Sequence, residues 1–209
     1  MEMKHITLIL AFLLTTFLCF GQNEHLEPAR DFSQYDGILK KYYDNVFPLL
    51  YSGFSEKPYA RYTSMPSFSA EYAFSVEKIE EKNYIISNKL SENFWYAKKS
   101  NGVKVSTIKI EINNDLYLRI GELFELLANQ TKVYKEDLGG LDGITYYFAT
   151  TDKNGEIKIG ETWSPREKSL LGRLVKICDN LHSFEIENNI DQTKMIKEIT
   201  LLINDFKIL

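Results

Sequence analysis

Cysteine and histidine are scarce in this chain of 209 residues, which has two cysteines and three histidines. One of the cysteines, Cys19, lies in an apolar N-terminal segment that we expect to be removed. Cys178 then has no partner for an internal disulfide, so stability must come from packing. Because Cys178 follows Leu174 by one helical turn, we interpret it as a small core residue and not as a thiol nucleophile.

Signatures of common catalytic and cofactor sites are also absent. Apart from His5 in the same N-terminal segment, His25 lies in a polar stretch and His182 at the expected end of a helix, where it would satisfy helix carbonyls. This pattern argues against a histidine-based triad or an imidazole zinc site. The chain has no Gly-x-Ser-x-Gly elbow, Walker phosphate loop or dinucleotide fingerprint. We therefore predict no metal and no cofactor.

Positive charge is not in surplus. The chain has 25 Lys and Arg against 29 Asp and Glu, a formal net charge of −4. Domains that bind nucleic acid carry basic patches, so nucleic acid is not expected as a partner. What is plentiful instead is aromatic character, with 13 Tyr and 13 Phe.

The N-terminus has the organisation of a secretory signal. A basic start precedes an apolar run over Ile6–Phe20, which is too short for a comfortable membrane span. Small residues at Cys19 and Gly21 predict cleavage after Gly21. Lipidation of Cys19 is the alternative, but Leu18 stands where a lipoprotein signal carries a small residue. We predict export to the periplasm or the medium, with no integral membrane span after cleavage.

Removal of the signal, residues 1–21, leaves enough chain for one domain with a substantial core. Residues 22–30 are polar and are expected to form a flexible lead, followed by a single domain over 31–209. Hydrophobic periodicity predicts helices from Phe32 to just before Pro48 with Asp31 as N-cap, from Asn114 or Asp115 to about Thr131, after Trp163, and from the N-cap Asp191 onward. Alternation predicts strands over 70–77, 83–90, 93–97 and 103–112 and two more in a hairpin. The predicted fold is α+β, with an antiparallel sheet of about six mostly hairpin-connected strands packed against helices in the order α-ββββ-α-ββ-αα.

The hairpin is the most complete local pattern. Two alternating stretches, 144–151 and 157–163, flank the turn Asp152–Gly155. A two-residue type I′ turn would place Phe148 opposite Glu161 and merge the two apolar faces, whereas a type I turn with a glycine bulge would slip the pairing by one residue. Burial favours the first register. In that register Glu161 lies on the apolar face and needs a partner, either water or a nearby Lys or Arg, with a role as catalytic acid as the alternative.

A capping box follows the hairpin directly. Ser164 could cap the N–H groups of a new helix, Pro165 would start that helix and Glu167 would close the box. We therefore predict that a helix leaves straight from the last strand.

Residues 48–66 form a long predicted connection with three prolines and several aromatic rings. A loop of this length is usually functional or wrongly assigned. Tyrosines gathered around an arginine are typical of surfaces that bind peptides, glycans or proteins, although the rings could instead cover the edge of the core. The residues predicted to bind a ligand are Tyr51, Tyr59, Arg61 and Tyr62.

These features favour an exported, non-catalytic binding or interaction protein whose partner is a protein, peptide or glycan. One alternative is a glycosidase-like hydrolase using Glu161, which needs a second acid in the same pocket; Glu71, Glu77 and Glu111 also lie on predicted strands. Another is a structural subunit of an envelope assembly, which needs an uncovered strand edge or a self-associating surface. Binding itself requires an exposed patch that includes a tyrosine of the 48–66 segment.

Overall fold

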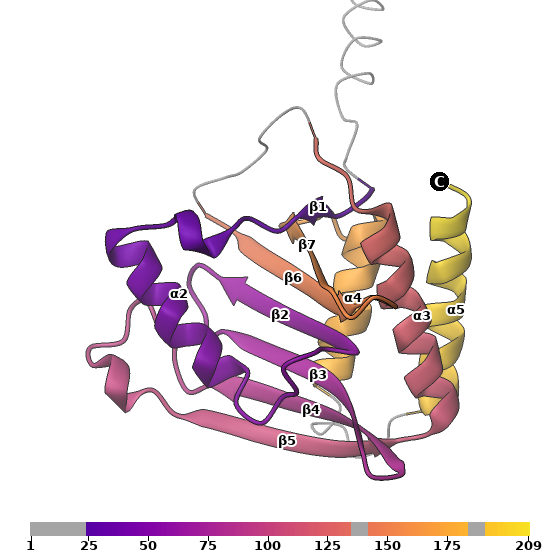
Figure 1. Cartoon of the computed structure of the whole chain (residues 1–209), viewed down its shortest axis with the longest axis horizontal. Coiled ribbons are helices and arrows are strands. Elements are labelled where there is room, and N and C mark those ends of the chain that lie inside the picture. Colours follow the sequence, from indigo (N-terminus) through magenta and orange to yellow (C-terminus); the bar gives the residue numbers. More distant parts are fainter. Residues whose placement is uncertain (1–23, 135–141, 184–190) are drawn as a thin grey trace, which may run out of the picture.

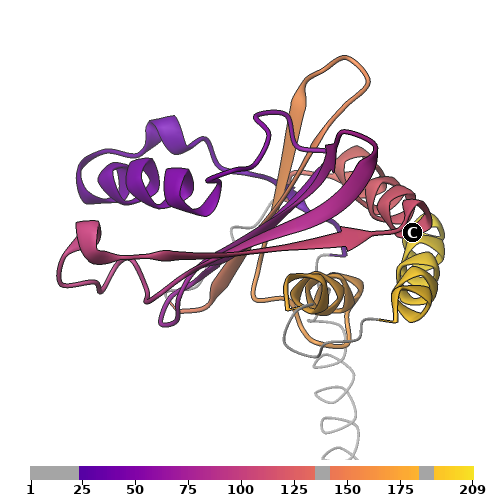
Figure 2. The same cartoon turned by 90° about the horizontal axis from the view of Figure 1, so that it is seen from below.

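The computed structural model describes residues 24–134, 142–183 and 191–209. Seven antiparallel strands form one sheet in the order β1-β7-β6-β2-β3-β4-β5. Helix α2 lies on one face, and α3, α4 and α5 cover the other (Figures 1 and 2). The predicted α+β class is confirmed, with one strand more than expected. The predicted signal, residues 1–21, lies outside the described residues.

The sheet and its helices have the following bounds in chain order: β1 Glu27–Pro28, the 3-10 turn η1 Phe32–Gln34, α2 Gly37–Leu50, β2 Ala60–Pro66, β3 Tyr72–Ile79, β4 Lys82–Leu90, the 3-10 turn η2 Ser100–Gly102, β5 Val105–Ile112, α3 Asn114–Gln130, β6 Ile144–Thr151, β7 Ile157–Trp163, α4 Leu170–His182 and α5 Gln192–Lys207. No helix in these ranges is long and apolar enough to cross a membrane.

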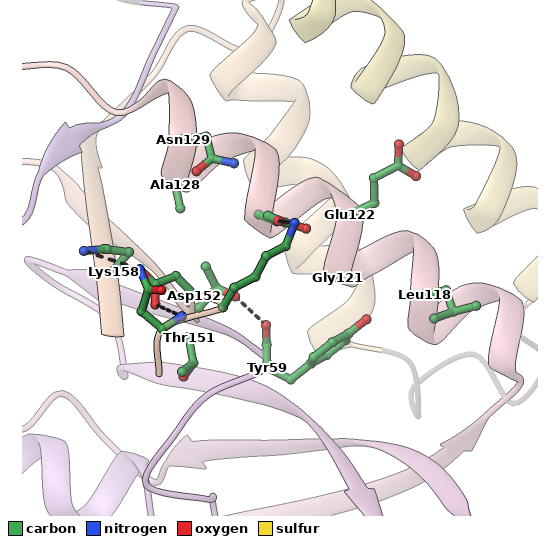
Figure 3. Close-up of a pocket in the computed structure, with 13 residues that line it drawn as sticks. Tyr59, Leu118, Gly121, Glu122, Ala128, Asn129, Thr151, Asp152 and Lys158 are labelled. Atoms are coloured by element: carbon green, nitrogen blue, oxygen red, sulfur yellow. Dashed lines mark hydrogen bonds and ion pairs between the residues drawn. The ribbon is translucent and has the colours of Figure 1, made fainter. Parts of the chain in front are cut away.

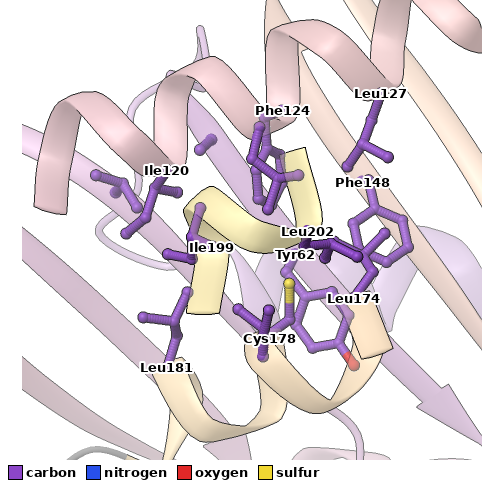
Figure 4. Close-up of a cluster of buried hydrophobic side chains, with 14 of the residues drawn as sticks. Tyr62, Ile120, Phe124, Leu127, Phe148, Leu174, Cys178, Leu181, Ile199 and Leu202 are labelled. Carbon is purple, nitrogen blue, oxygen red and sulfur yellow. The ribbon is translucent and has the colours of Figure 1, made fainter. Parts of the chain in front are cut away.

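Alternation of side chains along the strands creates two hydrophobic clusters. Tyr62 and Phe74 point to the larger cluster under α3, α4 and α5, while Met65 and Ala73 point to the smaller one under α2. Figure 4 shows the larger cluster, in which three helices meet the sheet through Phe124, Leu127, Leu174, Cys178, Leu181, Ile199 and Leu202. Cys178 is fully buried there, as the core interpretation predicted, and burial raises the pKa of its thiol.

The first helix differs from its prediction at both ends. Asp31 accepts a hydrogen bond from the Ser33 N–H, but this caps only the turn η1. Gly37, the first residue of α2, has φ +53°, so the chain changes direction where α2 begins. Helix α2 also continues through Pro48 to Leu50, because Val46 and Leu50 are one turn apart and both fully buried. Burial of this face outweighs the helix-breaking tendency of proline.

The caps of the later helices are local and specific. Asn113, one residue before the predicted caps, accepts the Leu116 N–H at 2.8 Å and starts α3. Asp191 accepts the Lys194 N–H at 3.0 Å and starts α5 as predicted. In both cases a short polar side chain satisfies a backbone donor that has no partner within the helix.

The favoured register of the β6–β7 hairpin is wrong, and the bulged alternative is correct. Ala149 lies opposite Ile159, and Tyr147 lies opposite Glu161. Gly155 has φ +81° and closes a type I turn followed by a glycine bulge. The slip moves Glu161 from the face of Phe148 to the face of Tyr147, which is the α2 face.

The Asp152 carboxylate explains this register. It accepts the N–H groups of Asn154 and Glu156, both at 2.9 Å. Two such bonds from one side chain stabilise this turn locally and do not depend on packing between the strands. Turn chemistry therefore outweighs the burial that would have merged the two apolar faces.

The capping box predicted after the hairpin is also wrong. Ser164 has φ +37°, and its Oγ accepts the Ile144 N–H at 2.9 Å, so it closes the hairpin instead of starting a helix. Helix α4 begins later, at Leu170, and Ser169 is its N-cap, accepting the Gly172 N–H at 3.0 Å.

Replacing Ser169 by Ala is expected to lower the free energy of unfolding by ~1 kcal/mol, because the Gly172 N–H loses its acceptor. Urea denaturation of the two proteins measures this difference. Ser169→Thr keeps the hydroxyl and serves as the control. An alanine variant as stable as the parent would contradict the assignment of the cap.

Two segments differ in type from their predictions. Strand β2 lies within the predicted 48–66 loop; all seven of its residues are buried, so no alternation marks it. The predicted strand 93–97 is a turn region, because the Asn93 side-chain amide donates to the carbonyls of Pro66 and Ser69 and its Oδ1 accepts the Tyr96 N–H. The side chain of Asn93 thus forms hydrogen bonds with backbone groups, and these bonds compete with the backbone pairing of a strand.

The segment predicted as a flexible lead contributes an edge strand. Glu27 and Pro28 pair with β7, and the Leu26 carbonyl accepts the Lys132 N–H at 2.9 Å. Leu26 is 1% exposed and lies against Gly160, where a Cβ would come within 2.8 Å of it. The part of the lead that the structure describes is therefore packed against the sheet.

Candidate functional site

The four residues predicted to bind a ligand lie in three places. Arg61 and Tyr51 are together on the α2 face, where the Arg61 guanidinium lies 4.6 Å from the centre of the Tyr51 ring and donates to the Ser55 carbonyl. Tyr62 is fully buried on the opposite face. Tyr59 stacks on Tyr117 at 4.2 Å between ring centres, beside α3.

Tyr59 borders a groove of about 630 Å³ between α3 and the β6–β7 turn (Figure 3). Burial raises the pKa of its hydroxyl to about 12. The charged residues of the groove are paired: Lys153 lies 3.5 Å from Glu125 and Lys158 lies 3.6 Å from Asp152, while Glu122 pairs with Lys207 outside the groove. Such exposed pairs are typical of a solvated surface.

A second cavity, of about 210 Å³, lies where β6 begins and β7 ends. We call it the Glu161 cavity. Its walls come from the residues just before α2, from α2 itself, from the end of β2 and from the β6–β7 hairpin. It is lined by Arg30, Tyr35, Tyr43, Met65, Ser67, Gly143, Thr145, Tyr147, Glu161, Thr162 and Trp163.

Glu161 is paired inside this cavity. Its side chain is 12% exposed, and Oε1 lies 3.4 Å from Nε of Arg30. The Arg30 backbone N–H also donates to Oε2 at 3.2 Å. The partner that the sequence required for Glu161 is therefore an arginine, as one alternative anticipated, and the pair has no net charge.

Aromatic rings form one side of the Glu161 cavity. Tyr35 and Tyr43 stack at 5.3 Å between centres, and Phe32 behind them contacts Tyr147 edge-on at 5.4 Å. Burial, helped by the neighbouring groups, raises the pKa of the Tyr43 and Tyr147 hydroxyls above their ordinary values. Both hydroxyls therefore keep their protons at neutral pH, and each can donate and accept hydrogen bonds.

Trp163 forms the rim of the cavity and is 39% exposed. Its indole lies on Gly143, where a Cβ would come within 2.6 Å of Nε1, so this close approach requires glycine. Ser67 also lines the cavity, and next to it Phe68 is 68% exposed and stacks on Tyr96. Exposed rings thus accumulate at one end of the sheet. At this end β2 finishes and β6 begins (Figure 1).

The other strand glutamates do not reach the Glu161 cavity. Glu71 is fully buried, where it accepts the Phe94 N–H and the Tyr42 hydroxyl. Glu77 accepts the Ser55 N–H and the Ser75 hydroxyl. Glu111 pairs with Lys82 on the far edge of the sheet, at 2.8 Å. Glu161 is thus the one carboxylate among the described residues of the lining.

A buried polar cluster under α4 was not predicted. Asp179 accepts the hydroxyls of Tyr62 and Tyr72, both at 2.7 Å, and His182 stacks on Tyr72 at 4.3 Å between ring centres. Burial raises the pKa of Asp179 and lowers that of His182 to about 4. His182 does end α4 as predicted, but its ring packs on the sheet.

The sequence identified Glu161 but not the residues around it. Arg30 is 131 positions away from Glu161, and no local pattern connects the two.

The described ranges contain no group of three or more His, Cys, Asp or Glu side chains that could hold a metal ion. Comparisons with protein-family models, curated proteins and solved structures give no match to this chain.

Proposed function

We propose that the mature protein is an exported, non-catalytic binding protein and that its ligand enters the Glu161 cavity. The signal-like segment 1–21 supports export. None of the tyrosines of the 48–66 segment lines this cavity, so the exposed patch expected there does not carry the binding role. One other observation carries it: an acid, a base and tyrosine hydroxyls line a single cavity beside a partly exposed tryptophan. Concave sites with a few convergent polar groups are the usual places for small ligands.

The chemistry of the lining favours a neutral, hydroxyl-rich ligand, and hence a saccharide among the partners predicted. The paired Arg30 and Glu161 offer donors and acceptors without net charge, whereas a charged ligand would have to separate them. Tyr43 and Tyr147 add neutral hydroxyls. The exposed part of the Trp163 ring supplies a flat apolar surface for the C–H face of a sugar ring.

A screen of residues 22–209 against immobilised neutral and charged glycans, followed by calorimetry with the best soluble glycan, tests this proposal. We expect Trp163→Ala and Glu161→Gln each to weaken binding at least tenfold, because each removes a group that contacts the ligand. Leu118→Ala, in the groove beside α3, is the matched control and should leave affinity unchanged.

Failure to bind any glycan, or affinities that these cavity variants do not alter, would overturn the proposal. Cleavage of a bound glycan by the parent and not by Glu161→Gln would support the hydrolase instead. The structure favours that alternative less, because glycosidases of this type use two carboxylates and the described lining supplies one.

A further inference from the structure

Strand β5 is a free edge of the sheet. Its one strand partner in the described part of the chain is β4, whereas the opposite edge is partly covered by β1. Its eight residues, Val105–Ile112, contain no proline or glycine, and several are β-branched. Figure 1 shows β5 along the outer side of the sheet, with no labelled element beyond it.

The hydrogen bonds of β4 show which backbone groups of β5 point outward. The Leu90 N–H donates to the Glu71 carbonyl on the β3 side, so the odd-numbered residues of β4 bond to β5. Their partners on β5 are even-numbered, as in the pairs Lys89 with Ser106 and Ile85 with Ile110. The odd-numbered residues of β5 therefore direct their N–H and C=O groups away from the sheet. These residues are Val105, Thr107, Lys109 and Glu111.

The side chains on this edge are complementary to themselves. If two copies of β5 pair antiparallel about a two-fold axis at Ile110, Lys109 of each copy lies opposite Glu111 of the other. Both residues have outward backbone groups, so each such pair can exchange two backbone hydrogen bonds. On the other face Ile110 meets its own copy, and Ile108 meets Ile112 of the second copy.

We propose that a second copy of this chain pairs with β5 in this register and continues the sheet across a two-fold axis. Lysine on an edge strand often prevents such pairing. Here the Lys109 ammonium lies 3.9 Å from the centre of the Tyr84 ring. Glu111, two residues along, pairs with Lys82 of its own chain and supplies the opposite charge for Lys109 of the second copy. Self-complementarity selects a second copy over an unrelated strand. This edge is separate from the proposed ligand site, which lies toward the other edge of the sheet.

Charge reversal tests the register. Sedimentation velocity of residues 22–209 should show a dimer for the parent protein. Lys109→Glu and Glu111→Lys should each weaken the dimer at least tenfold, because each places like charges opposite one another twice. An equimolar mixture of these two variants should dimerise again, since every pair across the axis is then opposite in charge. The double variant K109E/E111K should also dimerise.

A second experiment separates backbone pairing from charge. Lys109→Pro removes an outward N–H without removing a bond to β4, so it should abolish the dimer, whereas Lys109→Ala should weaken it less. Near-ultraviolet circular dichroism verifies that each variant is folded. A monomeric parent at all concentrations up to the millimolar range would overturn the proposal. So would a dimer that tolerates Lys109→Pro, or a mixture of the charge variants that stays monomeric.

Discussion

Replacing Gly172 by Ala is expected to lower the free energy of unfolding by at least ~3 kcal/mol. A Cβ at this position would lie 1.9 Å from the Arg166 carbonyl oxygen and 2.7 Å from its carbonyl carbon. Both are backbone atoms of the turn that precedes α4, and the Ser169 N–H is bonded to the same carbonyl at 3.0 Å. The turn must therefore separate from the helix, with loss of its hydrogen bonds. In an ordinary helix the same substitution would add ~1 kcal/mol of stability, so the sign is diagnostic.

Gly121→Ala in α3 is the matched control. Its Cβ would also meet an atom at 1.9 Å, but that atom is the hydroxyl oxygen of Tyr59, the end of a half-buried side chain beside an open groove. Rotation of the Tyr59 side chain relieves the clash, so the loss in free energy of unfolding should be much smaller than at Gly172. Adding Tyr59→Leu to Gly121→Ala should recover that loss. Urea denaturation of the variants measures the difference. Equal losses at the two glycines, or a gain at Gly172, would contradict the close packing of the turn on α4.

Elements with one buried face were predictable from the sequence. Helix α3 shows a regular apolar stripe, and Asp191 caps α5 as expected. Strand β2 was missed for the opposite reason: both of its faces are buried, so its side chains do not alternate between apolar and polar. Its position between β6 and β3 at the centre of the sheet is a consequence of long-range pairing, which no window of the sequence contains.

The hairpin shows how local chemistry can decide against a global argument. Merging the apolar faces favoured a two-residue turn, yet the Asp152 carboxylate binds two backbone N–H groups and sets a longer one. The slip by one residue changes the surroundings of Glu161 completely, from the main core to a cavity that opens under α2. The need of Glu161 for a partner was predictable from its strand position, but the identity of the partner, Arg30, was not.

Acidification is expected to destabilise the protein through His182. Burial lowers the pKa of its imidazole from 6.5 to about 4 in the folded chain, with a smaller contribution from Lys89. The unfolded chain therefore binds a proton that the folded chain does not. The stabilising contribution is complete above pH 6.5 and is lost as the pH falls from 6.5 toward 4. Integrated between pH 6.5 and pH 4, the loss in free energy of unfolding is about 3 kcal/mol.

His182→Phe isolates this effect, because phenylalanine keeps the stacking on Tyr72 and cannot titrate. Urea denaturation from pH 7 to pH 4 should show the variant gaining about 3 kcal/mol relative to the parent as the pH falls. Asp179, one turn earlier on α4, acts in the opposite direction, since burial raises its pKa and the folded chain takes up its proton first. Its contribution is common to both proteins and cancels in the difference. If the stability of the two proteins changed in parallel with pH, the folded chain would have to accommodate the protonated ring. That would require a hydrogen-bond partner for the buried Nδ1 of His182, and the described structure supplies none.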